Sequence, residues 1–136
     1  MTNMLSDENE FEDVVFRFVN MKNKNKGDIF QRRFKSMFGI DYCLALKVWS
    51  DLKSSNVLHN TKYNPKHLLM TLYFLKSYGI ERQISNMFEV DEKIYRKWIW
   101  IYIKALNKLS RFYVSYWIQI DKLLLTHRTN IWHKII

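Results

Sequence analysis

Glycine and proline are so scarce in this chain that they limit its fold more than any other feature: 136 residues contain 3 Gly and 1 Pro. Sandwiches and barrels built from short strands need these residues at closely spaced turns. Hydrophobic residues make up 48% of the chain and aromatic residues 16%, which is enough for a buried core and argues against global disorder. We therefore expect an all-α fold, a small multi-helix domain.

The ends and the cysteine content of the sequence bear on where the protein works. Cys43 is the single cysteine, so no intramolecular disulfide can form, and a reducing compartment is expected. Residues 1–13 carry five acids and no base, unlike a secretory signal. The longest apolar run, residues 98–103, is too short to span a bilayer. We expect an intracellular protein that does not enter membranes.

Positive charge is concentrated in two parts of the chain. The formal net charge is +9, and beyond residue 13 the chain has 22 basic and only 8 acidic residues. The bases gather within 17–35 and within 82–111. Clusters of this kind favour a polyanion, most simply the phosphates of nucleic acid. The alternative is a solvated basic surface without a partner.

Hydrophobic spacing divides the chain into three parts. Residues 1–27 read as an N-terminal helix, capped by Ser6 or Asp7, followed by a basic linker. Residues 28–111 read as a helical domain. Residues 112–136 form a tail without a clear period, compatible with a strand or with more helix.

Within the helical domain, local signals mark where helices begin and end. Gly39 is expected to end a helix that starts near Asp28, and Asp41 to begin the next. Asn64 followed by Pro65 is a typical helix start. The apolar residues expected inside the first of these helices are Ile29, Phe30, Phe34, Met37 and Phe38. Cys43 is also expected to be buried, as a structural thiol rather than a nucleophile.

A short helix, a tight turn and a longer basic helix at 81–109 predict a helix-turn-helix. Ser85 supplies the small residue needed where the first helix crosses the second. Such turns often use glycine because the backbone adopts positive φ, and here Glu89 stands at that position. Asp91 is expected to cap the second helix.

The second helix of this motif carries the residues expected to read DNA bases. Lys93, Arg96 and Lys97 are three and four residues apart and therefore share one face. Arg96 can donate two hydrogen bonds to guanine O6 and N7. Glu92 can accept a hydrogen bond from cytosine N4, and Trp100 points away from the expected core face toward DNA or a partner. The alternative is an ordinary solvated helix face.

Basic residues outside this face are candidates for contacts with DNA phosphates. They are Arg32, Arg33, Lys35, Lys62, Lys66 and Lys104.

Two long strings of the sequence resemble a known family. They are FQRRFKSMFGIDYCLALKVWSDL, and NPKHLLMTLYFLKSYGIERQISNMFEVDEKIYRKWIWIYIKAL. Within them, Asp91-Glu92-Lys93 together with Arg96-Lys97-Trp98 and Trp100 is the most specific part. These strings resemble the N-terminal helix-turn-helix region of eukaryotic DDE-superfamily transposases of the Harbinger-like group, and the resemblance covers about residues 30 to 117.

This resemblance implies a module that recognises the DNA ends of a transposable element in the nucleus. In the family, an RNase H-like domain would follow, with three carboxylates that hold two divalent metals. Only Asp121 is acidic after residue 92, so we expect a truncated transposase-like protein without cleavage activity or catalytic residues. A homodimer, or a separate catalytic transposase chain, is the expected protein partner.

No other chemistry is supported by the sequence. His and Cys spacings fit no usual zinc site, and no glycine-rich phosphate loop is present. We therefore expect no metal, no cofactor and no small-molecule substrate. The alternative to DNA binding is a helical protein–protein interaction module that uses the Trp100 face, with incidental DNA affinity.

Overall fold

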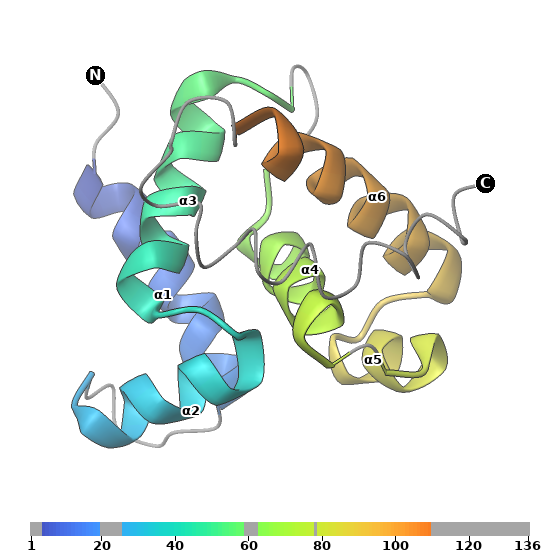
Figure 1. The fold of residues 1–136 in the computed structure, drawn as a ribbon, viewed down its shortest axis with the longest axis horizontal. Coiled ribbons are helices and arrows are strands. Elements are labelled where there is room, and N and C mark those ends of the chain that lie inside the picture. Colours follow the sequence, from blue (N-terminus) through green and yellow to red (C-terminus); the bar gives the residue numbers. More distant parts are fainter. Residues whose placement is uncertain (1–3, 20–25, 59–62, 78, 110–136) are drawn as a thin grey trace.

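The computed structural model describes residues 4–19, 26–58, 63–77 and 79–109, and all regular structure among them is α-helical. In chain order the helices are α1 (Met4–Val19), α2 (Asp28–Phe38), α3 (Tyr42–Ser55), α4 (Pro65–Ser77), α5 (Glu81–Met87) and α6 (Glu92–Leu109) (Figure 1). The expected all-α class is confirmed. Of these helices, none has the length and hydrophobicity to cross a membrane. The predicted tail at 112–136 lies outside the described residues.

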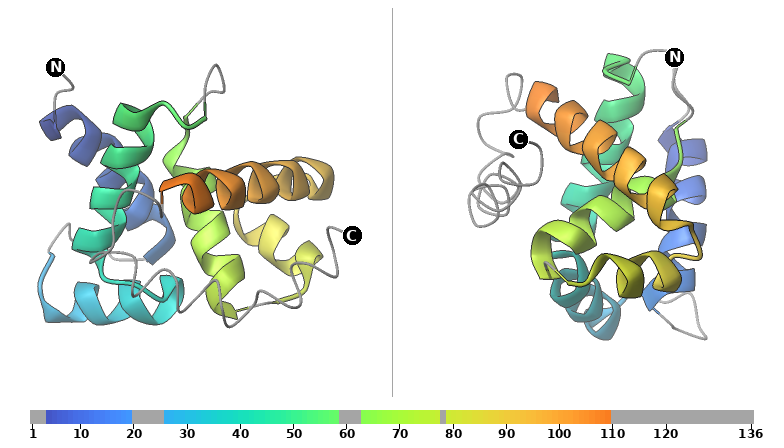
Figure 2. Two further views of the ribbon diagram at one scale, coloured as in Figure 1. Left: turned by 45° about the horizontal axis from the view of Figure 1, so that its top comes forward. Right: turned by 90° about the vertical axis from the view of Figure 1, so that its right-hand side faces the viewer.

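Helix α4 occupies the middle of the fold, between the group formed by α1, α2 and α3 and the pair formed by α5 and α6 (Figures 1 and 2). It packs against α1, α2 and α6. Its buried residues lie all round the helix and not along one stripe: Pro65, His67, Leu68, Leu69, Met70, Thr71, Leu72, Phe74 and Leu75. A helix that is apolar on every side must be enclosed by others. The other elements therefore arrange themselves around α4.

The helix ends that local sequence signals predicted are confirmed at three places. Gly39 ends α2 in the left-handed conformation, with φ of 84°. The side-chain oxygens of Asn64 and Asp91 each accept a hydrogen bond from the backbone N–H two residues further on, at 3.0 and 3.1 Å. These bonds satisfy N–H groups that have no partner inside the helix.

The start of α1 differs from the prediction. The helix already begins at Met4, so neither Ser6 nor Asp7 caps it. Asp7 is 3% exposed, and its Oδ1 lies 2.8 Å from Lys53 Nζ on α3. Burial alone would lower the pKa of Lys53, but hydrogen bonds to Asp7 and Glu10 outweigh it and raise that pKa. The prediction that Ser6 or Asp7 caps α1 is therefore wrong. Asp7 instead forms an ion pair with Lys53 of another helix.

A second ion-pair cluster ties α1 to the residues before α2. Lys26 Nζ lies 3.2 Å from a carboxylate oxygen of Glu8 and 3.0 Å from one of Glu12. These bonds, chiefly the one to Glu12, raise the pKa of Lys26. Together with the Lys53 pairs, they engage much of the acidic charge of the N-terminal segment within the chain.

On α2, one residue expected in the core faces solvent. Ile29 is 56% exposed, whereas Phe30, Phe34 and Phe38 are fully buried. The three phenylalanines repeat every four residues and define the core stripe, and Ile29 is turned about 100° away from it. The prediction that Ile29 lies in the core is therefore wrong.

Cys43 is also placed differently from the prediction, because it is exposed. The core stripe of α3 runs through Tyr42, Ala45 and Trp49. Cys43 lies on the opposite side of that helix, so its thiol is not a structural core group.

The contact between α4 and α6 includes a stacked pair of rings. The His67 ring lies 4.3 Å from the Trp98 ring, with 16° between their planes. His67 is 9% exposed, and burial, with the nearby Lys66 charge, lowers its pKa from 6.5 to about 4. The neutral imidazole is therefore the form that packs against α6.

Titration of His67 is expected to make stability depend on pH. The unfolded chain takes up this proton near pH 6.5 and the folded chain only near pH 4, so the unfolded state binds more protons in between. The His67 contribution is complete above pH 6.5 and is lost as the pH falls, by about 3 kcal/mol near pH 4. Urea unfolding of wild type and His67→Phe across this range measures it. Parallel pH profiles for the two proteins would contradict the prediction.

Candidate nucleic-acid interface

Residues 88–91 connect α5 to α6, and the chain reverses at Glu89, which has φ of 57°. The Glu89 N–H donates to the Asn86 carbonyl at 3.1 Å, and the Val90 N–H donates to the Ser85 carbonyl at 2.9 Å. This pair of bonds is a Schellman motif, in which the left-handed residue is usually glycine. The positive φ considered from the sequence is therefore present, on a residue that has a Cβ.

Two buried residues hold α5 in place. Ser85 is 1% exposed and its hydroxyl donates to the Arg82 carbonyl at 3.0 Å, so a small residue is needed there as expected. The Phe88 ring is fully buried, 5.9 Å from the Tyr73 ring of α4 and 4.6 Å from the Phe18 ring of α1. The turn is thus anchored to two other helices.

The solvent side of α6 presents a row of bases. Lys93, Lys97, Lys104 and Lys108 are exposed, and half-buried Trp100 lies between them. Their spacing of four, seven and four residues keeps them on one side of a helix. We call these five residues the α6 basic face. After its first residue, α6 contains no acid, so this face carries only positive charge.

The core side of α6 is rotated slightly from the expected one. The helical spacing of apolar residues predicts Tyr95, Trp98 and Ile101 on the core side of α6. Trp98 and Ile101 are only half-buried, whereas Ile99 and Ile103 are buried. Tyr95 is 2% exposed, as expected. Trp98 still packs against α4, since its ring stacks on His67, so the buried side of α6 is broader than one stripe of apolar residues.

Arg96 lies beside the basic face but is engaged by carboxylates. Its Nε is 2.6 Å from Glu81 Oε1 on α5, and its Nη2 is 3.8 Å from Glu92 Oε2. Arg82 Nε lies 3.4 Å from the other oxygen of Glu92. We call these four residues the Glu81–Arg96 network. It joins α5 to α6 and directs the guanidinium toward α5, while 56% of the side chain stays exposed.

Trp100 borders a cavity of about 290 Å³ between α4, α5 and α6. The other residues that line it are Phe74, Glu81, Tyr95, Arg96 and Ile99. Burial raises the pKa of Tyr95, and the Glu81 charge adds to that shift, so the phenol stays neutral. Trp100 therefore belongs partly to the packing of α6, with the remaining part of its ring accessible.

Two of the predicted phosphate contacts lie on or near α6. Lys104 belongs to the α6 basic face. Lys66 is half-buried at the start of α4, next to the His67 ring that stacks on Trp98. Lys62 lies outside the described residues.

The other predicted phosphate contacts are not brought to α6. Lys35 Nζ lies 3.6 Å from an Asp41 carboxylate oxygen. Arg32 and Arg33 are exposed on α2 and border a hollow formed by α1, α2 and α4. Because α4 separates α2 from α6, these arginines and the α6 basic face form two distinct basic surfaces (Figures 1 and 2).

Sequence reasoning missed three residues of this region. Lys108 could have been found, because it follows Lys104 by four residues and so shares its face. Glu81 and Arg82 could not, because their pairing with α6 depends on how the turn at Glu89 orients α5.

Within the part of the chain that the structure describes, no three or more His, Cys, Asp or Glu side chains gather as metal ligands would.

Comparison with protein-family models, with curated proteins and with solved structures gives no match to this chain. The likeness to Harbinger-like transposases thus remains a prediction that rests on the sequence strings themselves.

Replacing Glu89 by glycine is expected to stabilise the turn. A residue with a Cβ in the left-handed region costs about 1 kcal/mol relative to glycine. Glu89→Gly should therefore raise the free energy of unfolding by roughly 0.5–1 kcal/mol, measured by urea denaturation. Glu89→Ala removes the charge but keeps the Cβ, and should stay close to wild type. An equal gain in both variants would assign the effect to the charge instead.

Proposed function

We propose that this protein binds double-stranded DNA through the α6 basic face. The observation that supports this proposal best is a row of four exposed lysines on one side of a helix that has no acid after its first residue. Such a surface attracts a polyanion strongly, and DNA carries a regular array of phosphates. The preceding short helix and its tight turn have the arrangement that helix-turn-helix proteins use for docking.

In this proposal, α6 lies in the major groove. Its 18 residues span roughly 27 Å, and the first turns of such a helix approach the base edges. Lys93, Arg96 and Lys97 are proposed to read bases, with Glu92 and Trp100 at the edge of the contact. Lys104 and Lys108, further along the same face, and Lys66 are proposed to contact phosphates.

Selection of bound duplexes from a random-sequence pool tests the proposal. At roughly 0.2 M salt, nonspecific phosphate binding is weakened, so enrichment of a defined site indicates base reading. With about five phosphate contacts, the logarithm of the binding constant should fall with the logarithm of salt at a slope of about −4 to −5. No enrichment by the folded protein would contradict the proposal.

Arg96 is the residue whose loss should change the sequence preference. Arg96→Ala is expected to cost roughly 1–3 kcal/mol of specific binding and to relax one base position. Arg82→Ala is the matched control, because it removes the same charge from the same Glu81–Arg96 network but lies outside α6. Fluorescence anisotropy on the selected site and its single-base variants measures both. A preference unchanged in Arg96→Ala would remove Arg96 from base reading.

The carboxylate of Glu81 should oppose DNA binding, since it holds Arg96 at 2.6 Å. Glu81→Gln is nearly isosteric, removes a negative charge and frees the guanidinium. We expect Glu81→Gln to strengthen DNA binding by about three- to tenfold. This factor corresponds to roughly 1 kcal/mol, the size expected for the removal of one surface charge. Glu10→Gln, on α1, is the control for charge alone. Equal gains in both variants, or weaker binding by Glu81→Gln, would contradict a restraining role.

The resemblance to Harbinger-like transposases supports a narrower version of this proposal. In it, the protein recognises element ends in the nucleus and brings them to a catalytic subunit. The selected DNA also reports the assembly: two half-sites related by a two-fold axis indicate a homodimer, and one undivided site indicates a monomer.

A helical protein-interaction module is the second candidate, and the cavity beside Trp100 is the observation that favours it. Binding of a protein there should survive high salt and weaken in Trp100→Ala, whereas DNA binding by the α6 basic face should be lost as salt increases.

A further inference from the structure

The cavity between α4, α5 and α6 has the composition of a small-molecule site. Its volume is about 290 Å³, and an apolar cavity of about 150 Å³ already holds a benzene ring. Three of the described residues that line it carry aromatic rings: Phe74, Tyr95 and Trp100. These rings provide flat apolar surface against which a planar ligand can pack. We call this space the Trp100 cavity.

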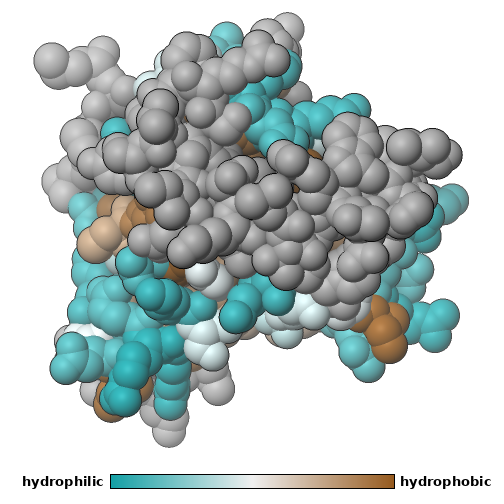
Figure 3. All heavy atoms as spheres, viewed as in Figure 1, coloured by the Kyte–Doolittle hydropathy of each residue, from teal (hydrophilic) through white to brown (hydrophobic). Residues whose placement is uncertain are grey.

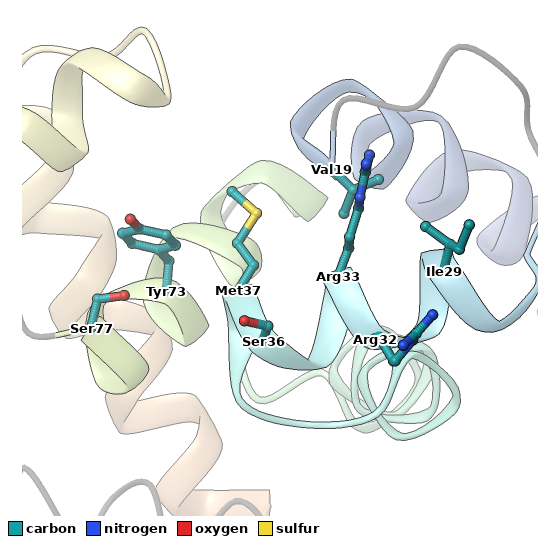
Figure 4. A pocket seen from close by; sticks show the side chains of 8 residues that line it. All are labelled: Val19, Ile29, Arg32, Arg33, Ser36, Met37, Tyr73 and Ser77. Carbon is teal, nitrogen blue, oxygen red and sulfur yellow. The ribbon is translucent and has the colours of Figure 1, made fainter.

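A larger hollow, of about 590 Å³ between α1, α2 and α4, is built differently (Figure 4). Among the residues labelled in Figure 4, Tyr73 has the single aromatic ring, and Met37 faces the same space. Arg33, which also lines this hollow, already has an interaction within the chain. Several rings and an accessible charge come together at the Trp100 cavity instead.

The ring of Trp100 is available to a ligand. Trp49 and Trp98 stack on other rings, whereas Trp100 makes no ring contact in the described part of the chain. Trp100 is half-buried, so one part of its ring lines the cavity and another part reaches solvent. Ile99, the next residue along the same wall, is 2% exposed. A planar molecule can therefore enter from solvent and lie against the Trp100 ring.

The charged residues of this cavity favour an anion. Glu81 and Arg96 both line it, and the Arg96 side chain is 56% exposed against 33% for Glu81, so the cation is the more accessible member of the pair. Glu81 occupies Nε of the guanidinium, and Nη2 approaches Glu92 only to 3.8 Å. The two Nη groups can therefore bind a carboxylate side by side. The formal charge of the chain, +9, adds to this preference.

The surface beside α5, which contributes Glu81 to the cavity, is amphipathic. Figure 3 shows hydrophobic atoms among hydrophilic ones next to this helix. Ile80, directly before α5, is 64% exposed. A ligand that approaches from this side meets apolar and charged groups together, which suits a molecule with a ring and a charge.

We infer that the Trp100 cavity binds a small aromatic carboxylate, whose ring packs against Tyr95 and Trp100 and whose carboxylate pairs with Arg96. The carboxylate takes the Nη groups while Glu81 keeps Nε, so the ligand adds to the contacts that join α5 to α6. This binding does not require DNA. One consequence rests on the proposed DNA binding: the bound carboxylate withholds Arg96 from bases and so weakens binding to the selected duplex.

Three probes test the site on the full chain. Phenylacetate carries a ring and a carboxylate, phenethylamine carries the ring with the opposite charge, and acetate carries the carboxylate alone. In NMR titrations of the isotope-labelled protein, phenylacetate should shift the Trp100 indole N–H and Ile99 methyl signals. Phenethylamine and acetate should bind at least tenfold more weakly. No shift of these signals by phenylacetate, or an equal affinity for either of the other probes, would overturn the inference.

Two arginine variants examine the charged part of the site. Arg96→Gln keeps most of the side-chain length but removes the charge, and should weaken phenylacetate about tenfold. Arg82→Gln is the matched control, because Arg82 belongs to the same Glu81–Arg96 network but does not line the cavity. Circular dichroism checks that both variants keep the helical fold. Equal losses in the two variants would reduce the effect to net charge and overturn the assignment of Arg96.

The ring contact and the link to DNA are tested separately. Trp100→Ala should remove most of the phenylacetate affinity, and an affinity equal to that of wild type would overturn the inference. Saturating phenylacetate should weaken wild-type binding to the selected duplex at least threefold, and an unchanged affinity would contradict the link to DNA. If the NMR shifts appear in a protein that selects no DNA site, the DNA proposal fails and the cavity site stands. If a DNA site is selected and the shifts are missing, the cavity inference fails alone.

Discussion

The burial of α4 on nearly every side is the constraint on which the rest of the structure depends. A helix with leucine, methionine and phenylalanine on every side cannot remain on a surface, because each such side chain contributes about 1.5–3 kcal/mol when it is removed from water. Its neighbours must therefore cover it from several directions, and α1, α2 and α6 do so. As a result, the group formed by α1, α2 and α3 and the pair formed by α5 and α6 are held at fixed positions on either side of α4.

Ion pairs that involve α1 make the distribution of charge over the protein uneven. The acidic residues of α1 pair with Lys26 and Lys53, which fastens that helix to α2 and α3 and uses much of the negative charge inside the domain. Asp7 in particular is almost fully buried, so its pairing with Lys53 compensates a charge that would otherwise destabilise the fold. Four exposed lysines lie on the solvent side of α6, at the other end of the domain from these ion pairs.

The connection between α5 and α6 combines local backbone strain with the restraint on DNA binding that we propose. Glu89 holds a conformation that glycine would adopt more easily, and the Schellman hydrogen bonds with the buried Phe88 ring maintain it. This turn sets the position of Glu81 relative to Arg96. In the proposed DNA complex, the same geometry that presents α6 also keeps its most discriminating residue partly occupied, so specificity and restraint arise from one structural element.

Local chemistry explains what could be read from the sequence. The scarcity of glycine and proline predicted an all-α fold, and Gly39, Asn64 and Asp91 marked helix ends, because a cap or a left-handed residue acts within a few positions along the chain. The lysines of α6 could also be assigned to one face from the sequence, because their spacing and the helical period alone decide which residues share a face.

Only the tertiary structure decided which of several apolar sides each helix buries. Ile29 and Cys43 lie on the solvent sides of their helices, and Ile99 is more fully buried than Trp98, because each outcome depends on where α4 and its neighbours lie. The pairing of Arg96 with Glu81 depends in the same way on the orientation of α5. The sequence by itself determined the helical class, the helix ends at Gly39, Asn64 and Asp91 and the basic side of α6. Packing around α4 decided how the helices are oriented, since hydrophobic burial is not directional and the chain contains more apolar surface than one stripe per helix can account for.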